Sequence, residues 1–94
     1  MRKITERIRM AWKAGKKLSV DNTMTDGNSV WLFGNKIIKV EDGKVYATYA
    51  EHPTRTTSER LNGITVGWFA VRKEQAYFDG MPIENDEWVL VGSK

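Results

Sequence analysis

Few residues in this 94-residue chain have the types and spacing that catalysis requires. The only histidine, His52, stands before Pro53 in a predicted loop, and Glu51 beside it would point to the other side of an extended strand. The carboxylates are scattered over predicted turns and the C-terminal tail, without the spacing of an acid–base pair. Cysteine and a glycine-rich phosphate loop are both absent. The sequence therefore predicts a protein that is not an enzyme and that holds no cofactor.

Positive charge is concentrated near the N-terminus. Residues 1–17 contain seven basic residues and one acidic residue, a net charge of +6, whereas residues 18–94 contain eight basic and eleven acidic residues, a net charge of −3. The basic residues are Arg2, Lys3, Arg7, Arg9, Lys13, Lys16 and Lys17. A solvated helix face and a surface for nucleic-acid phosphates both have this composition. A membrane-surface helix is the weakest alternative at this length with a single Trp, so we expect no membrane partner.

A second candidate site lies where the sequence predicts a short helix over residues 56–63. Hydroxyl side chains precede this helix, and the guanidinium groups of Arg55 and Arg60 lie near its free backbone N–H groups. That arrangement suits a phosphate or a carboxylate. A well-capped helix without a ligand is the alternative, because Thr56 and Glu59 have capping-box spacing.

The basic cluster is carried by a predicted amphipathic helix over residues 2–14, within the segment 1–15. Ile4, Ile8 and Trp12 recur at helical spacing and form one apolar stripe. We expect this stripe to pack over a sheet, which leaves the basic side chains on the polar side of the helix.

The best-specified stretch is a three-stranded antiparallel meander over about residues 29–50. The predicted turns are Gly34-Asn35 and Asp42-Gly43, dipeptides that accept the positive φ angles of hairpin turns. Two-residue turns fix the register, and side chains alternate across the pleat. The predicted core face carries Trp31, Phe33, Ile38, Val40, Val45, Ala47 and Tyr49. The other face mixes Val30, Leu32, Ile37 and Tyr46 with Lys39, Glu41, Lys44 and Thr48.

The remaining segments complete a predicted α+β fold. A short strand is expected within residues 17–21, where the segment 17–50 of strands begins. The polar loop over residues 22–28 lacks EF-hand spacing and the closing glutamate, so no metal site is predicted there. The region 66–91 supplies C-terminal antiparallel strands. Together these segments predict a single domain over residues 1–94, with both helices packed on or beside the sheet.

The composition of the chain restricts the cellular location that we expect for the protein. No apolar run approaches the roughly 20 residues of a membrane span, and the N-terminus lacks the apolar stretch of a signal peptide. The absence of cysteine fits a reducing compartment. We therefore expect a soluble, intracellular protein.

Four short segments resemble a group of small proteins encoded in tailed-phage and prophage genomes, whose function is generally unassigned. The segments are NTMTDG at 22–27, LFGNKI at 32–37, TTSERLNG at 56–63 and AYFDG at 76–80. Their order and spacing carry the likeness, which covers residues 20–91. The resemblance implies a phage accessory protein in the cytoplasm of a bacterial host, and it implies no reaction.

Two functions from different classes follow from these patterns. The first is a protein that binds and modulates a host or defence protein through Leu32, Tyr46, Arg55 and Arg60, because Tyr and Arg commonly anchor protein interfaces. The second is a nucleic-acid-binding protein that uses the seven basic residues of the N-terminal helix together with the Arg55 and Arg60 loop, with Tyr46 and Trp31 nearby for stacking on a single strand. The negative charge of the rest of the chain favours the first.

Overall fold

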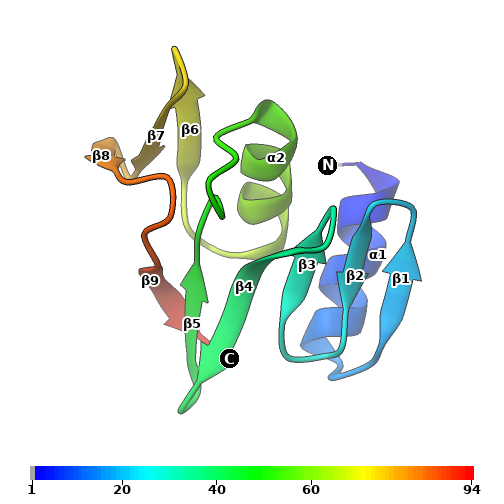
Figure 1. Cartoon of the computed structure of the whole chain (residues 1–94). Helices are drawn as coiled ribbons and strands as arrows, with labels where there is room; N and C mark the ends of the chain where they lie inside the picture. Colours follow the sequence, from blue (N-terminus) through cyan, green and yellow to red (C-terminus); the bar gives the residue numbers. More distant parts are fainter. Residues whose placement is uncertain (1) are drawn as a thin grey trace.

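The computed structural model describes residues 2–94, which form two helices and nine strands (Figure 1). The helices are α1 (Lys3–Lys13) and α2 (Arg55–Ile64). The strands are β1 (Leu18–Val20), β2 (Thr23–Thr25), β3 (Val30–Leu32), β4 (Asn35–Glu41), β5 (Lys44–Ala47), β6 (Phe69–Arg72), β7 (Gln75–Phe78), β8 (Met81–Ile83) and β9 (Val89–Ser93). The predicted α+β class, with an N-terminal helix and C-terminal strands, is confirmed.

The strands form two antiparallel sheets. The larger sheet has the order β1-β2-β3-β4-β5-β9, and the smaller has the order β6-β7-β8. Figure 1 shows β9 returning from the C-terminal part of the chain to lie beside β5. One expectation is wrong here, because the loop predicted over residues 22–28 contains β2. Of the C-terminal strands, β9 extends the larger sheet, whereas β6, β7 and β8 form the smaller one.

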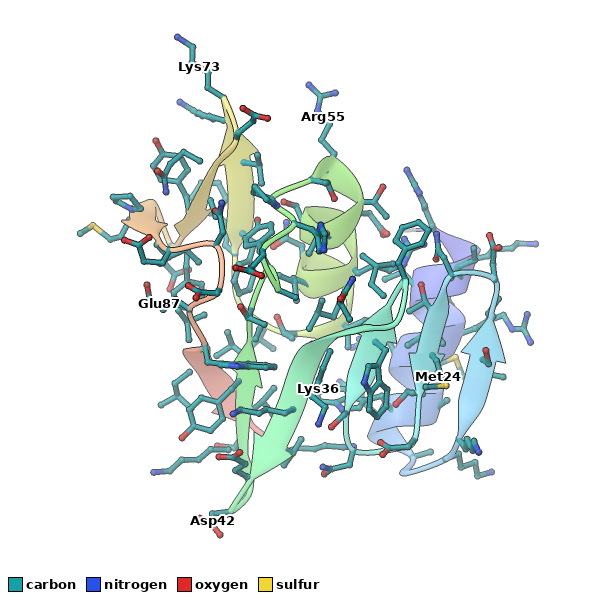
Figure 2. The ribbon with its side chains drawn as sticks, in the orientation of Figure 1. Met24, Lys36, Asp42, Arg55, Lys73 and Glu87 are labelled. Atoms are coloured by element: carbon teal, nitrogen blue, oxygen red, sulfur yellow. The ribbon has the colours of Figure 1, made fainter. Side chains whose placement is uncertain are left out.

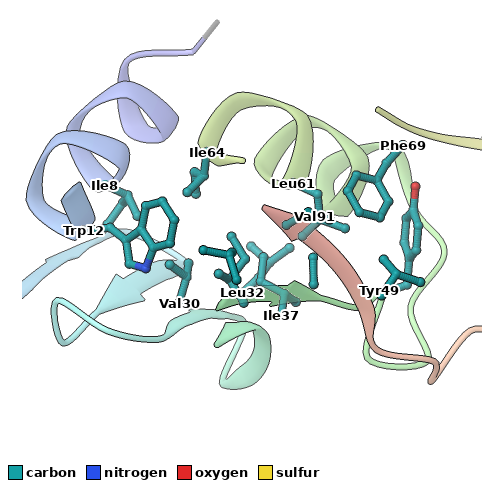
Figure 3. Close-up of a cluster of buried hydrophobic side chains, with 14 of the residues drawn as sticks. Ile8, Trp12, Val30, Leu32, Ile37, Tyr49, Leu61, Ile64, Phe69 and Val91 are labelled. Carbon is teal, nitrogen blue, oxygen red and sulfur yellow. The ribbon is translucent and has the colours of Figure 1, made fainter. Parts of the chain in front are cut away.

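Both helices pack on one side of the larger sheet. In Figure 1, α1 lies behind β1 and β2. The apolar stripe of α1 is buried there at Ile8 and Trp12, as its spacing predicts. Helix α2 contacts α1, β4 and β6, and it buries Leu61 and Ile64. Figure 3 shows the resulting core as one continuous cluster of side chains from Ile8 to Phe69.

The first hairpin turn differs from the prediction by one residue. Phe33 and Gly34 occupy the turn, with φ angles of 51° and 80°, and Asn35 already pairs with Leu32. A bulge follows, since Trp31 pairs with Lys36 while Val30 pairs with Ile38. A slip of one residue exchanges the two faces of a strand. Val30 and Leu32 are therefore buried, whereas Phe33 is exposed and Trp31 is half-buried.

The bulge also corrects the predicted environment of Ile37. This residue is the extra residue of β4, and it is buried together with Ile38 rather than lying on the mixed face. Beyond the bulge the predicted register is confirmed, because Val40 pairs with Val45 and the Asp42-Gly43 turn has φ angles of 52° and 77°.

The start of α2 also differs from the prediction. Thr54 is the N-cap, with extended backbone angles, and its hydroxyl accepts a hydrogen bond from the Thr57 N–H. Thr56 lies inside the helix, so the capping box with Glu59 does not form. Nothing in the described part of the chain is a helix long and apolar enough to cross a membrane.

Candidate functional site

A cavity of about 340 Å³ lies between the β3–β4 turn and the start of α2. Its lining residues are Leu32, Phe33, Asn35, Ile37, Tyr49, His52, Thr54 and Thr57. We call this site the hairpin cavity. Its size and its mixture of apolar walls with a few polar groups are typical of ligand and side-chain binding pockets.

Phe33 has an unusual conformation at the edge of the hairpin cavity. Its φ angle of 51° lies in the left-handed region, and its side chain is 69% exposed. The first position of this turn type normally carries Asn, Asp or Gly, because a bulky side chain is strained there. Among the non-glycine residues with positive φ in residues 2–94, Phe33 is the only aromatic residue. Its backbone N–H donates to the Asn22 carbonyl at 2.8 Å, which holds the turn against β2.

Tyr49 forms an inner wall of the hairpin cavity. Its side chain is fully buried, and its hydroxyl lies 2.6 Å from the Ser58 hydroxyl and donates to the Ala70 carbonyl at 3.2 Å. Burial raises the pKa of the Tyr49 phenol, and the hydrogen bond with Ser58 offsets part of this effect. Because these partners already satisfy the hydroxyl, Tyr49 contributes its ring to the cavity rather than a reactive group.

The polar rim of the hairpin cavity comes from the start of α2 and the loop before it. The Thr54 hydroxyl accepts from the Thr57 N–H at 3.1 Å and lies 2.9 Å from the Thr57 hydroxyl. His52 is exposed, and its backbone N–H donates to the Tyr49 carbonyl at 2.9 Å. The lining residues include no carboxylate, so the cavity lacks the second partner of a carboxylate–histidine pair.

The four residues predicted to contact a protein partner occupy three different environments. Leu32 is only 4% exposed, but its side chain lines the hairpin cavity. Arg55 is exposed at the first position of α2, next to Thr54 of the cavity rim. Tyr46 is half-buried on the opposite face of the sheet, where it pairs with Lys39. The structure therefore places Leu32 in the hairpin cavity and Arg55 one residue beyond its rim in sequence, and it leaves Tyr46 elsewhere.

Arg60 is buried, with an exposure of 1%, and it connects the two helices to the sheet. Its Nε donates to the Thr23 hydroxyl at 3.0 Å, and its Nη1 donates to the Thr5 hydroxyl at 3.1 Å. It also forms an ion pair with Glu59. Arg60 cannot contact a partner from this position, so the predicted anion site at Arg55 and Arg60 is not assembled.

The Glu59 carboxylate completes this buried network. Burial alone would raise its pKa, but hydrogen bonds from the Thr5 hydroxyl at 2.6 Å and from Arg60, together with the Arg60 charge, hold the pKa of Glu59 below its usual value. The carboxylate is therefore charged at neutral pH and balances the buried guanidinium group.

The basic residues of the N-terminal segment lie away from both the core and the hairpin cavity. Arg2, Lys3, Arg7, Lys13, Lys16 and Lys17 are exposed, and Arg9 is half-buried. The only aromatic residue of α1, Trp12, is buried, and its indole N–H donates to the Asn28 carbonyl at 2.9 Å. This charged helix surface thus offers no exposed ring on which a nucleic-acid base would stack.

Sequence reasoning missed Phe33, Asn35 and Thr57 as cavity residues. The prediction of a Gly34-Asn35 turn placed Phe33 within a strand on the core face, which concealed its exposure. The informative feature is Gly34, which serves equally well as the second residue of a turn that begins at Phe33. That alternative places the aromatic side chain at the hairpin tip.

Comparison with known proteins matches the chain to a family. The family model described as Kyanoviridae Gp96 protein matches residues 1–90. No curated protein and no solved structure matches the chain.

Proposed function

Because the chain belongs to the Kyanoviridae Gp96 protein family and is a phage accessory protein, we propose that it binds a host or defence protein through the hairpin cavity. The predicted origin in a phage-encoded family is confirmed by this membership. In the proposal the protein acts by occupying a surface of its target in the cytoplasm of the host cell, and it catalyses no reaction.

The conformation of Phe33 is the observation that carries the proposal. A residue held in a sparsely populated backbone region costs about 1–3 kcal/mol, and such strain is concentrated at functional sites. Asn at this position would form a favourable Asn-Gly turn with Gly34. An exposed, strained phenyl ring beside an apolar cavity therefore contributes little to the fold, and it is well placed to contact a partner.

The cavity and Phe33 together form the kind of surface that anchors a protein partner. A side chain of the target would enter between Leu32 and Ile37, and it would pack against the exposed ring of Phe33. Anchors that fill such desolvated pockets contribute about 2 kcal/mol or more to binding. Arg55, which follows the rim residue Thr54 in sequence, is an exposed charged group that would orient an acidic residue of the target.

Catalysis is the less favoured alternative for the same cavity. His52 is the only histidine among its lining residues, and no carboxylate lies beside it there. The Tyr49 hydroxyl is engaged by Ser58 and Ala70, which leaves no second group for acid–base work.

Site-specific photo-crosslinking tests the proposal. A photo-crosslinking phenylalanine analogue would replace Phe33 in one protein and Lys73 in a matched control, because both residues are exposed in two-residue turns with positive φ. In nuclease-treated lysate of host cells, we expect one host protein to be crosslinked from position 33 and not from position 73. In a separate affinity pull-down without any crosslinking residue, Phe33→Asn should abolish capture of the same protein by the otherwise unmodified chain.

The opposite pattern would contradict the proposal. If Phe33→Asn captures the target as well as the unmodified protein does, the hairpin cavity is not the binding surface. A target that is captured only without nuclease treatment would point to nucleic acid as the true ligand.

A further inference from the structure

The face of the larger sheet that points away from the helices carries a group of aromatic and basic side chains. This outer face carries Met24, Trp31, Lys36, Lys39, Lys44, Tyr46 and Leu90, together with the acidic Glu41. Figure 2 shows Met24 and Lys36 on the side of the strands toward the viewer, whereas α1 lies behind β1 and β2. Met24 is 36% exposed and Leu90 is 52% exposed, so the face is open to solvent at both of these residues.

The aromatic rings of the outer face are surrounded by ammonium groups. Lys36 lies over the ring of Trp31, with its Nζ 5.4 Å from the ring centroid. Lys39 Nζ lies 5.9 Å from the centroid of the Tyr46 ring. Lys44 is exposed close to the β4–β5 turn, on the same face as Lys39. Half-buried rings beside lysine ammonium groups combine a surface for stacking with a surface for phosphate groups.

We propose that the outer face binds single-stranded nucleic acid. Bases stack on Trp31 and Tyr46, and phosphates contact Lys36, Lys39 and Lys44. A sheet with helices on one face and stacked bases on the other is an arrangement that also serves RNA recognition elsewhere. This surface is distinct from the hairpin cavity, so the inference does not depend on the protein partner proposed above.

The spacing of the two rings favours a single strand over a duplex. Trp31 lies on β3 and Tyr46 on β5, which are separated by two strand spacings of about 4.8 Å each. Consecutive bases of a duplex are stacked only about 3.4 Å apart, so they cannot each reach one ring. The unstacked bases of a single strand can spread over this distance.

Acidic residues limit the path of the polyanion. Glu41 is paired with Lys39 at 3.2 Å, which reduces the charge of that part of the face. Glu51 and Asp86 border a hollow that also contains Lys36 and Trp88. Trp88 lies against the same face, since Lys39 Nζ is 4.4 Å from the centroid of its ring. The nucleic-acid strand therefore runs over β3, β4 and β5, and the carboxylates of Glu51 and Asp86 limit how far it extends past Lys36.

Binding of fluorescent oligonucleotides of about 12 nucleotides, both DNA and RNA, tests this inference. Three phosphate contacts predict that log K falls with log salt with a slope of about −2, whereas seven contacts through the basic helix would give about −5. The double substitution Trp31→Ala with Tyr46→Ala should weaken binding by at least about tenfold. Trp31→Phe with Tyr46→Phe, which keeps the rings, should retain most of it.

A matched control separates the outer face from the basic helix. Substitution of Arg2, Lys3, Arg7 and Lys13 by Gln removes exposed positive charge from the opposite side of the molecule, and we expect it to change affinity by less than about threefold. Circular dichroism establishes that each variant is folded.

Three results would overturn the inference. The first is no binding of either oligonucleotide at about 50 mM salt, where phosphate contacts are strongest. The second is loss of binding in the helix variant but not in the Trp31 and Tyr46 variant. The third is equal competition by polyglutamate, which would show that the face accepts any acidic chain without stacking.

Discussion

The guanidinium group of Arg60 donates from Nε to the hydroxyl of Thr23 at 3.0 Å, and 37 positions of sequence separate the two residues. The same side chain reaches Thr5 on α1, so one buried charge joins α1, α2 and β2. A basic residue that sequence alone assigns to a binding surface is therefore a structural residue. Arg60 lies on α2, a helix that buries few apolar side chains. The hydrogen bonds of Arg60 to Thr5 and Thr23 therefore help to hold this helix in the core.

Removal of the buried Arg60 charge should lower the stability of the fold. Arg60→Leu leaves Glu59 without its ion pair and the Thr5 and Thr23 hydroxyls without their donor, so we expect a loss of about 3 kcal/mol in the free energy of unfolding. Urea denaturation measures this change. The exposed Arg55→Leu should change stability by less than about 0.5 kcal/mol, and equal losses in the two variants would disprove the structural role.

The hydrogen-bonded network of Arg60, Glu59 and Thr5 also makes the stability of the fold depend on pH. The pKa of Glu59 is lowered in the folded state, so its contribution is complete above the unfolded pKa and is lost as the pH falls through the folded pKa. Glu59→Gln should therefore be less stable than the natural protein near neutral pH, and the difference should shrink below about pH 4. Melting temperatures across this range measure the effect. A difference that stays constant with pH would contradict it.

The turn at Phe33 predicts a stabilising substitution. Phe33→Asn creates an Asn-Gly pair in a turn that needs two positive φ angles, so the free energy of unfolding should rise by about 1 kcal/mol. Chemical denaturation measures the change, with Lys73→Asn in the other exposed turn as a comparison. A clear loss of stability would mean that the Phe33 ring packs onto the fold rather than facing a partner.

The register of β3 and β4 is tested by two substitutions. Ile38 is fully buried, so Ile38→Ala should cost about 2–5 kcal/mol. Trp31→Ala should cost only about 1 kcal/mol, because the larger side chain is half-buried on the outer face. Urea denaturation of both variants gives the comparison. If Trp31→Ala costs more, the strand faces are reversed.

The contrast between the two hairpins shows how far local sequence determines this fold. Asp42-Gly43 leads to the right register, because both residues suit the turn and the flanking strands have no extra residue. Phe33-Gly34-Asn35 permits two turns, and the bulge at Ile37 decides between them by burying Ile37 and Ile38 together. That choice depends on packing against α1 and α2, which no local pattern contains.

The candidate site follows the same division. Leu32, which the sequence singles out as an apolar residue of the mixed face, lines the hairpin cavity, whereas Arg55 lies outside its lining. Arg60 is assigned wrongly, because its partners Thr5 and Thr23 are distant in the chain. Long-range hydrogen bonds of this kind depend on the tertiary fold.

The side chain of Asn62 has a consequence for how molecules of this protein meet one another. Its amide accepts from the Phe69 N–H at 2.6 Å and donates to the Phe69 carbonyl at 2.8 Å, as a neighbouring strand would. The unpaired edge of β6 is therefore occupied at its first residue, and Pro82 removes a donor from the edge strand β8 at the other side of the small sheet. Both edges thus resist the strand-to-strand association that leads to aggregation.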